Sequence, residues 1–253
     1  MKTLRDTWLL FARSMMGTLR QPVWVIVGLT QPIFFLVLFA PLLDGVSKAP
    51  GFPRGGALNI FMPGLLVQLG LYGTAFVGFG LIAELRAGVI ERLRVTPVSR
   101  LALLLGRALR DIVILLAQSI LLVAAAWPFG LKVNLPGLAA TLGLLVLLGL
   151  VMVCCSYAVA LALKSEDALA PVLNTVTLPM LLLSGILLPL SLAPGWLRAV
   201  AHVNPLAYAV DAARSLFNGH AADVAVTQGF IIMGVLTVLS LWWAAGAFRQ
   251  ATA

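Results

Sequence analysis

"LAATLGLLVLLGLVMVCCSYAVALAL", residues 138–163, is a run of 26 residues without a single Asp, Glu, Lys or Arg. About 20 apolar residues in a helix cross a hydrocarbon layer of about 30 Å, so this run predicts a transmembrane helix. The rest of the chain is similar: only 10% of its 253 residues are charged, and the mean hydropathy is +1.06. A soluble domain has about 25% charged residues. The composition therefore excludes an ordinary soluble protein.

Five further apolar runs are long enough to cross a membrane. They lie near 23–43, 60–82, 108–128, 171–190 and 229–248. Together the six runs predict an all-α membrane protein with six transmembrane helices in a single transmembrane domain, residues 1–253. The first run begins at Val23, is about twice as long as the apolar core of a signal peptide and lacks a clear cleavage site. We expect it to remain in the mature chain.

The distribution of Lys and Arg predicts the orientation, because positive residues flanking a span are retained in the cytoplasm. With the N-terminus inside, the cytoplasmic segments hold twelve of the seventeen basic residues, namely Lys2, Arg5, Arg13, Arg20, Arg86, Arg92, Arg94, Arg100, Arg107, Arg110, Lys164 and Arg249. The outer segments hold the other five. Both termini are therefore predicted to be cytoplasmic. The net charge of +8 is explained by an anionic inner leaflet, so no nucleic-acid partner is expected.

Residues 1–22 have the pattern of an amphipathic helix. Apolar residues recur every three or four positions, at Leu4, Trp8, Phe11, Met15 and Leu19, and arginines fall on the opposite side. Such a helix is expected to lie in the inner membrane interface, with its apolar face toward the lipid tails. An ordinary solvated helix is the alternative.

The most charged stretch of the chain is ELRAGVIERLRVTPVSR, residues 84–100. Its apolar residues are spaced four apart, which predicts a short amphipathic helix over 84–95. Thr96 and Pro97 end this helix and open the next one, because a residue before proline avoids helical geometry and proline suits a first helical position. The segment either transmits force into the third span or is a passive interfacial helix. Periodicity alone does not separate these interpretations.

The fifth run, 171–190, is interrupted by Gly185, Pro189 and two further prolines, so we expect kinks or an early end. The following segment, 191–219, is too polar to span and too apolar for a free loop. Asn204 suits an N-cap, and Pro205 suits the first helical position after it. These features predict a helical hairpin that dips into the outer leaflet. A hairpin lying on the surface is the alternative.

The chain contains no recognisable catalytic motif. None of its four lysines follows a glycine, so there is no phosphate-binding loop of the Gly-Lys-Ser/Thr type, and both histidines lie in the outer hairpin. The carboxylates lie in loops or near span ends, which disfavours an ion-coupled carrier. Asp111 is the deepest, and snorkelling or pairing explains it. The sequence predicts a protein that is not an enzyme, with no cofactor or metal of its own.

Two stretches carry a family resemblance. ELRAGVIERLRVTPVSRLALLLGRAL, residues 84–109, resembles the segment after the second span in type-2 ATP-binding-cassette exporter permeases of the daunorubicin-resistance-like group. There the pattern E-R-E-x-G-T-x-E-R-L-x-V-T-P-[VL]-S-R is typical. LLSGILLPLSLAPGWLRAVAHVNPLAYAVDAARSLF, residues 182–217, resembles a second signature, in which Gly and Pro close the fifth span and N-P-L-x-Y begins an outer helix. Tyr208 completes that signature in this chain.

The resemblance implies a permease subunit of an ATP-driven exporter in a bacterial plasma or inner membrane. Residues 84–95 would be a coupling helix seated on a separate nucleotide-binding ATPase, which would bind ATP and Mg. The matching residues are Glu84, Arg86, Gly88, Glu91, Arg92 and Arg94, followed by Thr96 and Pro97. Leu85 and Val89 depart from the family pattern. A second permease copy or a related permease is the further partner, besides membrane lipid.

The substrate is expected to be lipophilic or amphipathic: a drug, a lipid or a glycoconjugate. A pathway along a permease dimer seam would involve polar or adaptable residues of the first, second and fifth spans, which are Gln31, Phe34, Phe35, Gln68, Asn174, Thr177 and Met180. Helix packing is the alternative role for each. An ion-coupled or facilitative carrier and a non-transporting membrane scaffold are the alternative functions.

Overall fold

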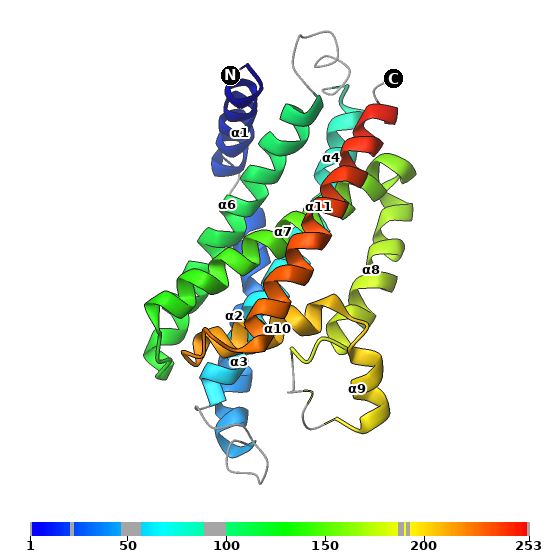
Figure 1. Ribbon diagram of the computed structural model, residues 1–253. Helices are drawn as coiled ribbons and strands as arrows, with labels where there is room; N and C mark the ends of the chain where they lie inside the picture. The colour runs from blue at the N-terminus through cyan, green and yellow to red at the C-terminus, as the bar shows by residue number, and fades with distance from the viewer. Residues whose placement is uncertain are drawn as a thin grey trace.

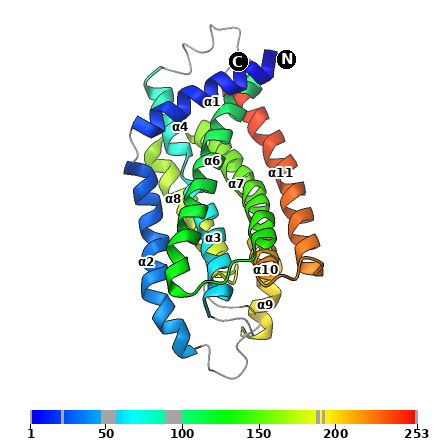
Figure 2. The same ribbon diagram turned by 90° about the vertical axis from the view of Figure 1, so that its left-hand side faces the viewer.

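The computed structural model describes the chain except for residues 1, 21–22, 47–56, 89–99, 187–189, 191–192 and 252–253. The described part is all-helical, with no strand. The long helices run side by side along one axis (Figures 1 and 2). Both termini lie at one end of the bundle, which we call the terminal end. The opposite end holds α9 and α10 (Figure 1).

Four stretches of the described chain are long and apolar enough to cross a membrane. They are Leu58–Arg86, Leu101–Phe129, Leu135–Leu163 and Val224–Gln250. The first combines α3 (Ala57–Ala75) with α4 (Gly78–Arg86), and the others correspond to α6 (Arg100–Ala126), α7 (Leu135–Leu163) and α11 (Val224–Ala251). A multi-pass membrane protein is therefore supported.

The remaining predicted spans fall on α2 and α8. The N-terminal helix α1 (Lys2–Arg20) meets α2 (Val23–Val46) at a bend of 68°, and the two make a fifth candidate only if they form one span. On the fifth predicted run, α8 (Glu166–Leu182) has only 17 residues. Pro171 and Pro179 lie inside α8, which ends earlier than the predicted boundary at 190. Six spans therefore remain a prediction.

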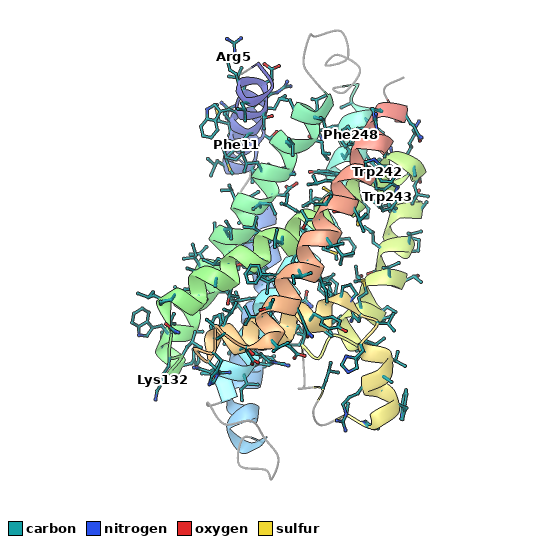
Figure 3. The ribbon with its side chains drawn as sticks, viewed as in Figure 1. Arg5, Phe11, Lys132, Trp242, Trp243 and Phe248 are labelled. Atoms are coloured by element: carbon teal, nitrogen blue, oxygen red, sulfur yellow. The ribbon has the colours of Figure 1, made fainter. Side chains whose placement is uncertain are left out.

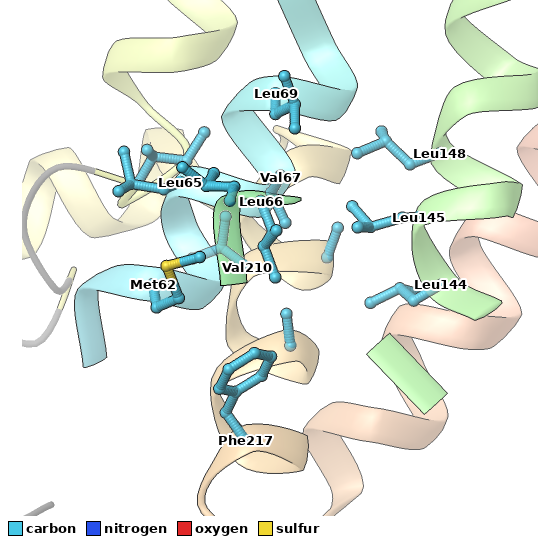
Figure 4. Packing of buried hydrophobic residues seen from close by; sticks show 14 of the residues in the cluster. Met62, Leu65, Leu66, Val67, Leu69, Leu144, Leu145, Leu148, Val210 and Phe217 are labelled. Carbon is cyan, nitrogen blue, oxygen red and sulfur yellow. The ribbon is translucent and has the colours of Figure 1, made fainter. Parts of the chain in front are cut away.

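The core of the bundle is built around α3, α7 and α10 (Pro205–Phe217). Figure 4 shows apolar side chains of α3 facing those of α7, with Val210 and Phe217 of α10 closing the cluster. The α3 and α7 members are Met62, Leu65, Leu66, Val67, Leu69, Leu144, Leu145 and Leu148, all at most 1% exposed. Lipid tails are as apolar as leucine, so close van der Waals packing stabilises this core more than exclusion of water does.

Small residues bring the second span close to α7, as the four-residue spacing of Gly70, Thr74 and Gly78 predicts. A Cβ atom at Gly78 would lie 2.8 Å from the Ser156 backbone oxygen of α7. The span breaks here, between α3 and α4. The Ser156 hydroxyl donates to the Ala75 carbonyl at 2.5 Å and accepts from the Gly78 N–H at 2.9 Å. One side chain of α7 thus satisfies backbone groups on both sides of the break.

Exposed tryptophans mark both ends of the bundle. Trp242 and Trp243 project from α11 toward the terminal end, while Lys132 lies at the opposite end (Figure 3). Near Lys132, Trp127 in the short 3-10 helix η1 (Trp127–Phe129) is 72% exposed. Tryptophan is enriched at both membrane–water interfaces, so these positions fit a bundle whose axis crosses the bilayer.

At the opposite end lie α9 (Gly195–Ala201) and, after it, α10. These two helices make up the segment that is predicted to form an outer hairpin. The prediction for α10 is confirmed: the Asn204 side chain accepts from the Leu206 N–H at 3.0 Å, and Pro205 is the first residue of the helix. Gly219, just past its end, has φ of +80°, a conformation that glycine adopts readily.

The N-terminal amphipathic helix is also confirmed as a helix. It packs on α6, where a Cβ atom at Gly106 would lie 2.8 Å from the Cβ of Leu10. Leu4, Trp8 and Leu19 remain 61–77% exposed. The apolar stripe is therefore divided between a face that contacts α6 and a face that stays largely exposed.

Candidate functional site

The terminal end carries an ion pair between the two helices that flank residues 89–99. Glu84 lies in the last turn of α4, and its carboxylate accepts a hydrogen bond from the Arg107 guanidinium on α6. The Arg107 side chain is 8% exposed and that of Glu84 is 36% exposed. The pair therefore joins α4, which precedes residues 89–99, to α6, which follows them.

A second ion pair joins α4 to α8. Arg86 donates to the Glu166 carboxylate at 3.2 Å, with both side chains well exposed, at 57% and 38%. Exposed pairs of this kind contribute about 0–1 kcal/mol. This pair therefore orients the end of α4 without contributing much stability.

Asp111 of α6 lies deeper and is 4% exposed at its side chain. One carboxylate oxygen accepts from Arg110 at 2.6 Å, and the other accepts from the Tyr157 hydroxyl of α7 at 2.5 Å. Of the two expectations for Asp111, pairing is therefore the one observed. Sequence reasoning missed Tyr157, because a tyrosine in an apolar run carries no periodic signal for a partner on another helix.

The structure corrects the boundary of the predicted helix over 84–95. Glu84 and Arg86 belong to α4, which continues the second span and ends at Arg86. The Gly88 N–H then bonds to the Leu85 carbonyl, and Gly88 has φ of +66°, so the chain turns away from the helix there. Glu91, Arg92, Arg94, Thr96 and Pro97 lie outside the described residues. A coupling helix beyond Gly88 stays a prediction.

At the opposite end, Arg214 of α10 holds three backbone segments together. Its guanidinium donates to the carbonyls of Ile60 at 3.1 Å and Gly185 at 2.6 Å, and Asp211 lies 3.9 Å away. Asp211 and Arg214 lie three residues apart on α10, a spacing that lets side chains meet on one helix face. Burial lowers the pKa of the Arg214 guanidinium, and the Asp211 carboxylate opposes this shift. The carbonyl partners were missed, because backbone acceptors leave no trace in a sequence.

The predicted hairpin residues cluster around Arg214 and its partners. Gly185 has φ of +75°, and the Asn204 amide donates to the Met180 carbonyl at 2.6 Å, which ties α10 to α8. The Tyr208 hydroxyl donates to the His202 carbonyl at 3.1 Å. Pro189 lies outside the described residues. Insertion of the hairpin into the outer leaflet is not tested by these contacts.

The candidate pathway residues do not form one surface. Gln31, Phe34 and Asn174 are exposed, Phe35 and Met180 are half-buried, and Gln68 and Thr177 are buried. The Thr177 hydroxyl bonds to the Leu173 carbonyl of its own helix at 2.8 Å, so a packing role accounts for it. Gln68 is 1% exposed, and within the described part of the chain neither Nε2 nor Oε1 has a hydrogen-bond partner.

An all-helical bundle with four or five candidate spans and a charged segment at one end defines a multi-pass membrane protein. Comparison with known families identifies which one: the chain belongs to the ABC-2 type transporter family, which matches residues 5–218.

Named relatives are transport permeases. The chain is 27% identical to the daunorubicin resistance ABC transporter permease protein DrrB1 of Streptomyces coeruleorubidus, over 94% of this chain and 80% of the relative. It is 29% identical to the putative transport permease ycf38 of Porphyra purpurea, over 92% and 82% of the two chains. It is 25% identical to the probable doxorubicin resistance ABC transporter permease protein DrrC of Mycobacterium tuberculosis H37Rv, over 79% and 72%.

Proposed function

We propose that this chain is the membrane permease subunit of an ATP-driven exporter and moves a lipophilic or amphipathic substrate out of the cytoplasm or inner leaflet. The observation that carries the proposal is the family match over residues 5–218. Relatives named for daunorubicin and doxorubicin resistance support a drug-like substrate. Lipids and glycoconjugates share the same amphipathic chemistry.

The driving energy is proposed to come from a separate ATPase subunit that binds ATP and Mg. Residues 89–99 connect α4 to α6, and Glu84–Arg107 joins these helices at the terminal end. A partner that pushed on this segment would act on two helices held as a pair rather than on one alone. This arrangement supports residues 84–97 as the region that receives the ATPase.

Two permease copies, or this chain and a related permease, are proposed to form the pathway. α3 packs against both α2 and α8, and those two helices present large exposed apolar side chains such as Phe34, Leu38 and Val176. Gln68, buried on α3 without a described hydrogen-bond partner, would meet substrate only if the helices packed on α3 moved. The exposed faces of α2 and α8 therefore support a seam with a second permease.

The ion-coupled carrier is the main alternative. Such a carrier needs a carboxylate at membrane depth that gains and loses a proton or ion. Among the described residues Asp111 is the buried carboxylate, and both of its oxygens already accept hydrogen bonds, from Arg110 and Tyr157. An occupied carboxylate favours a structural role, so the exporter is the better supported function.

The proposed coupling is tested by Glu91→Lys. The change makes the segment more basic, so a passive membrane anchor tolerates it. A contact with an ATPase gains like-charge repulsion or an unpaired charge, at a cost of about 1–3 kcal/mol. We expect normal membrane insertion together with about five- to a hundredfold weaker ATPase association, measured by co-purification with a co-expressed ATPase subunit and by substrate-stimulated ATP hydrolysis.

Asp167→Lys is the matched control, because Asp167 is an exposed carboxylate in the first turn of α8. It should leave both readouts near wild type. Wild-type association and hydrolysis with Glu91→Lys would remove Glu91 from the contact. ATP hydrolysis by the permease free of any other protein, or proton-sensitive flux without ATP, would overturn the proposed function itself.

A further inference from the structure

A small cavity lies at the opposite end of the bundle, between α9, α10 and the start of α11, and Leu190, Ala207 and Ala225 give it an apolar part beside its polar one. Its volume is about 240 Å³, and its polar lining consists of Arg198, His202, Tyr208, Asp211 and Gln228. Pockets for drug-sized ligands have volumes of about 300–1,000 Å³. This cavity is therefore suited to a compact polar group rather than to a whole drug-like molecule.

The walls of the cavity are fixed by contacts already within the chain. The Tyr208 hydroxyl donates to the His202 carbonyl at 3.1 Å, which holds the end of α9 against α10. α10 in turn is anchored to α8 through Asn204 and the Met180 carbonyl. Arg198 donates through Nε to the Ala193 carbonyl at 3.0 Å, its one side-chain hydrogen bond with the described residues. Its two terminal nitrogens are thus available to a ligand.

The cavity presents both signs of charge. Arg198 supplies a cation with a planar pair of donors that suits phosphate oxygens. Asp211 supplies an anion whose side chain is 53% exposed and whose pairing with Arg214 is long, at 3.9 Å. A simple phosphate would gain from Arg198 but would be repelled by Asp211. A group that carries a phosphate and an ammonium a few atoms apart satisfies both side chains, because an ammonium donates three hydrogen bonds.

The surroundings of the cavity favour a lipid as the source of such a group. Trp196 on α9 and Val203 just after it are 69% and 84% exposed, although both are large and apolar. Tryptophan is enriched at the level of lipid headgroups, where the apolar side chains beside it meet the upper acyl chains. A headgroup in the cavity would therefore have its tails beside an apolar surface.

We infer that this cavity binds the phosphoethanolamine headgroup of a zwitterionic phospholipid, with the phosphate at Arg198 and the ammonium at Asp211. His202 and Gln228 supply further donors to the phosphate oxygens. The inference does not rest on the proposed function, because it requires no nucleotide, ATPase or exported substrate.

Native mass spectrometry of the full chain in detergent tests the site, with phosphatidylethanolamine and phosphatidylglycerol of identical acyl chains titrated separately. We expect phosphatidylethanolamine to bind about threefold more tightly, the size of one partly exposed ion pair. Asp211→Asn should abolish this preference while both lipids still bind. Arg198→Ala should weaken both lipids about tenfold, because it removes a charge-assisted contact with the shared phosphate.

Arg13→Ala is the matched control, since Arg13 is an exposed arginine on α1 near the terminal end. It should leave the lipid preference unchanged. Equal affinity for the two lipids in the wild-type chain, or a preference that survives Asp211→Asn, would overturn the inference. Soluble phosphoethanolamine and inorganic phosphate form the last arm. Neither should displace the lipid at equal concentration, and displacement by either would assign the cavity to a soluble ligand instead.

Discussion

Several polar side chains inside this bundle have hydrogen-bond partners on other helices. Asp111, Ser156 and Arg214 each bond to a group on another helix, whereas buried hydroxyls such as that of Thr177 bond to a carbonyl of their own helix. The partners on other helices decide how neighbouring helices are positioned, because an unpaired polar group in a low-dielectric interior costs about 1–3 kcal/mol. Gln68 departs from this rule within the described chain.

Tyr157→Phe tests the rule at a single atom. It removes the hydroxyl that donates to Asp111 and leaves a buried carboxylate oxygen without that donor. We expect the free energy of unfolding to fall by about 1–3 kcal/mol, measured by denaturant titration in detergent micelles. Tyr208→Phe is the matched control, since its hydroxyl bonds to a carbonyl near the exposed surface, and it should cost under about 1 kcal/mol. An equal loss for both variants would contradict a special role for the Asp111 contact.

Among the helices, the ends of α4 and α6 are connected by the Glu84–Arg107 pair, and a double-mutant cycle measures that connection. Glu84→Gln leaves a nearly buried guanidinium without its carboxylate. We expect a coupling free energy of about 1–3 kcal/mol between Glu84→Gln and Arg107→Gln in detergent unfolding. The same cycle on Arg86 and Glu166, which are more exposed, should give under about 1 kcal/mol. Equal values for the two pairs would show that burial of Arg107 adds nothing.

The elements differ in how far the sequence predicted them. Long apolar runs gave α7 and α11 nearly to their ends, and the Asn-Pro cap placed the start of α10, because these signals are local. The break between α3 and α4 was missed, since the hydroxyl that satisfies its backbone groups, that of Ser156, lies on another helix. The site was predicted at the level of segments. Its internal partners, Arg107, Tyr157 and the backbone carbonyls around Arg214, depend on tertiary contacts that no periodicity reports.

For the molecule as a whole, the orientation in the membrane is the prediction with the widest consequences. Both termini lie at the same end of the bundle, opposite α9 and α10 (Figures 1 and 2). Together with the excess of arginines near that end, this predicts that Ala221 faces outward and Ala87 faces the cytoplasm. In a background with Cys154 and Cys155 replaced by Ala, we expect Ala221→Cys to react with an impermeant thiol reagent in intact cells. Ala87→Cys should react only after the cells are opened.

Both positions are exposed, so access to reagent depends on the side of the membrane and not on burial. Ala87 is preferred to Gly88, where the positive φ would strain an introduced cysteine. Labelling of Ala87→Cys in intact cells would show that the orientation is the reverse of the predicted one. An ATPase in the cytoplasm would then have to bind the opposite end of the bundle.

The length of the second span gives the ion pairs at its end a further significance. Leu58–Arg86 comprises 29 residues, which at about 1.5 Å per residue extends about 43 Å, well beyond a hydrocarbon layer of about 30 Å. At the terminal end of this span the Arg86–Glu166 pair is well exposed, so water and ions screen its charges. That pair can open and re-form at low cost, whereas the Glu84–Arg107 pair is held by a nearly buried guanidinium. The second span thus ends in one weak ion pair beside a stronger one, so α4 can part from α8 while it stays joined to α6 and while the Asp111 contacts stay closed.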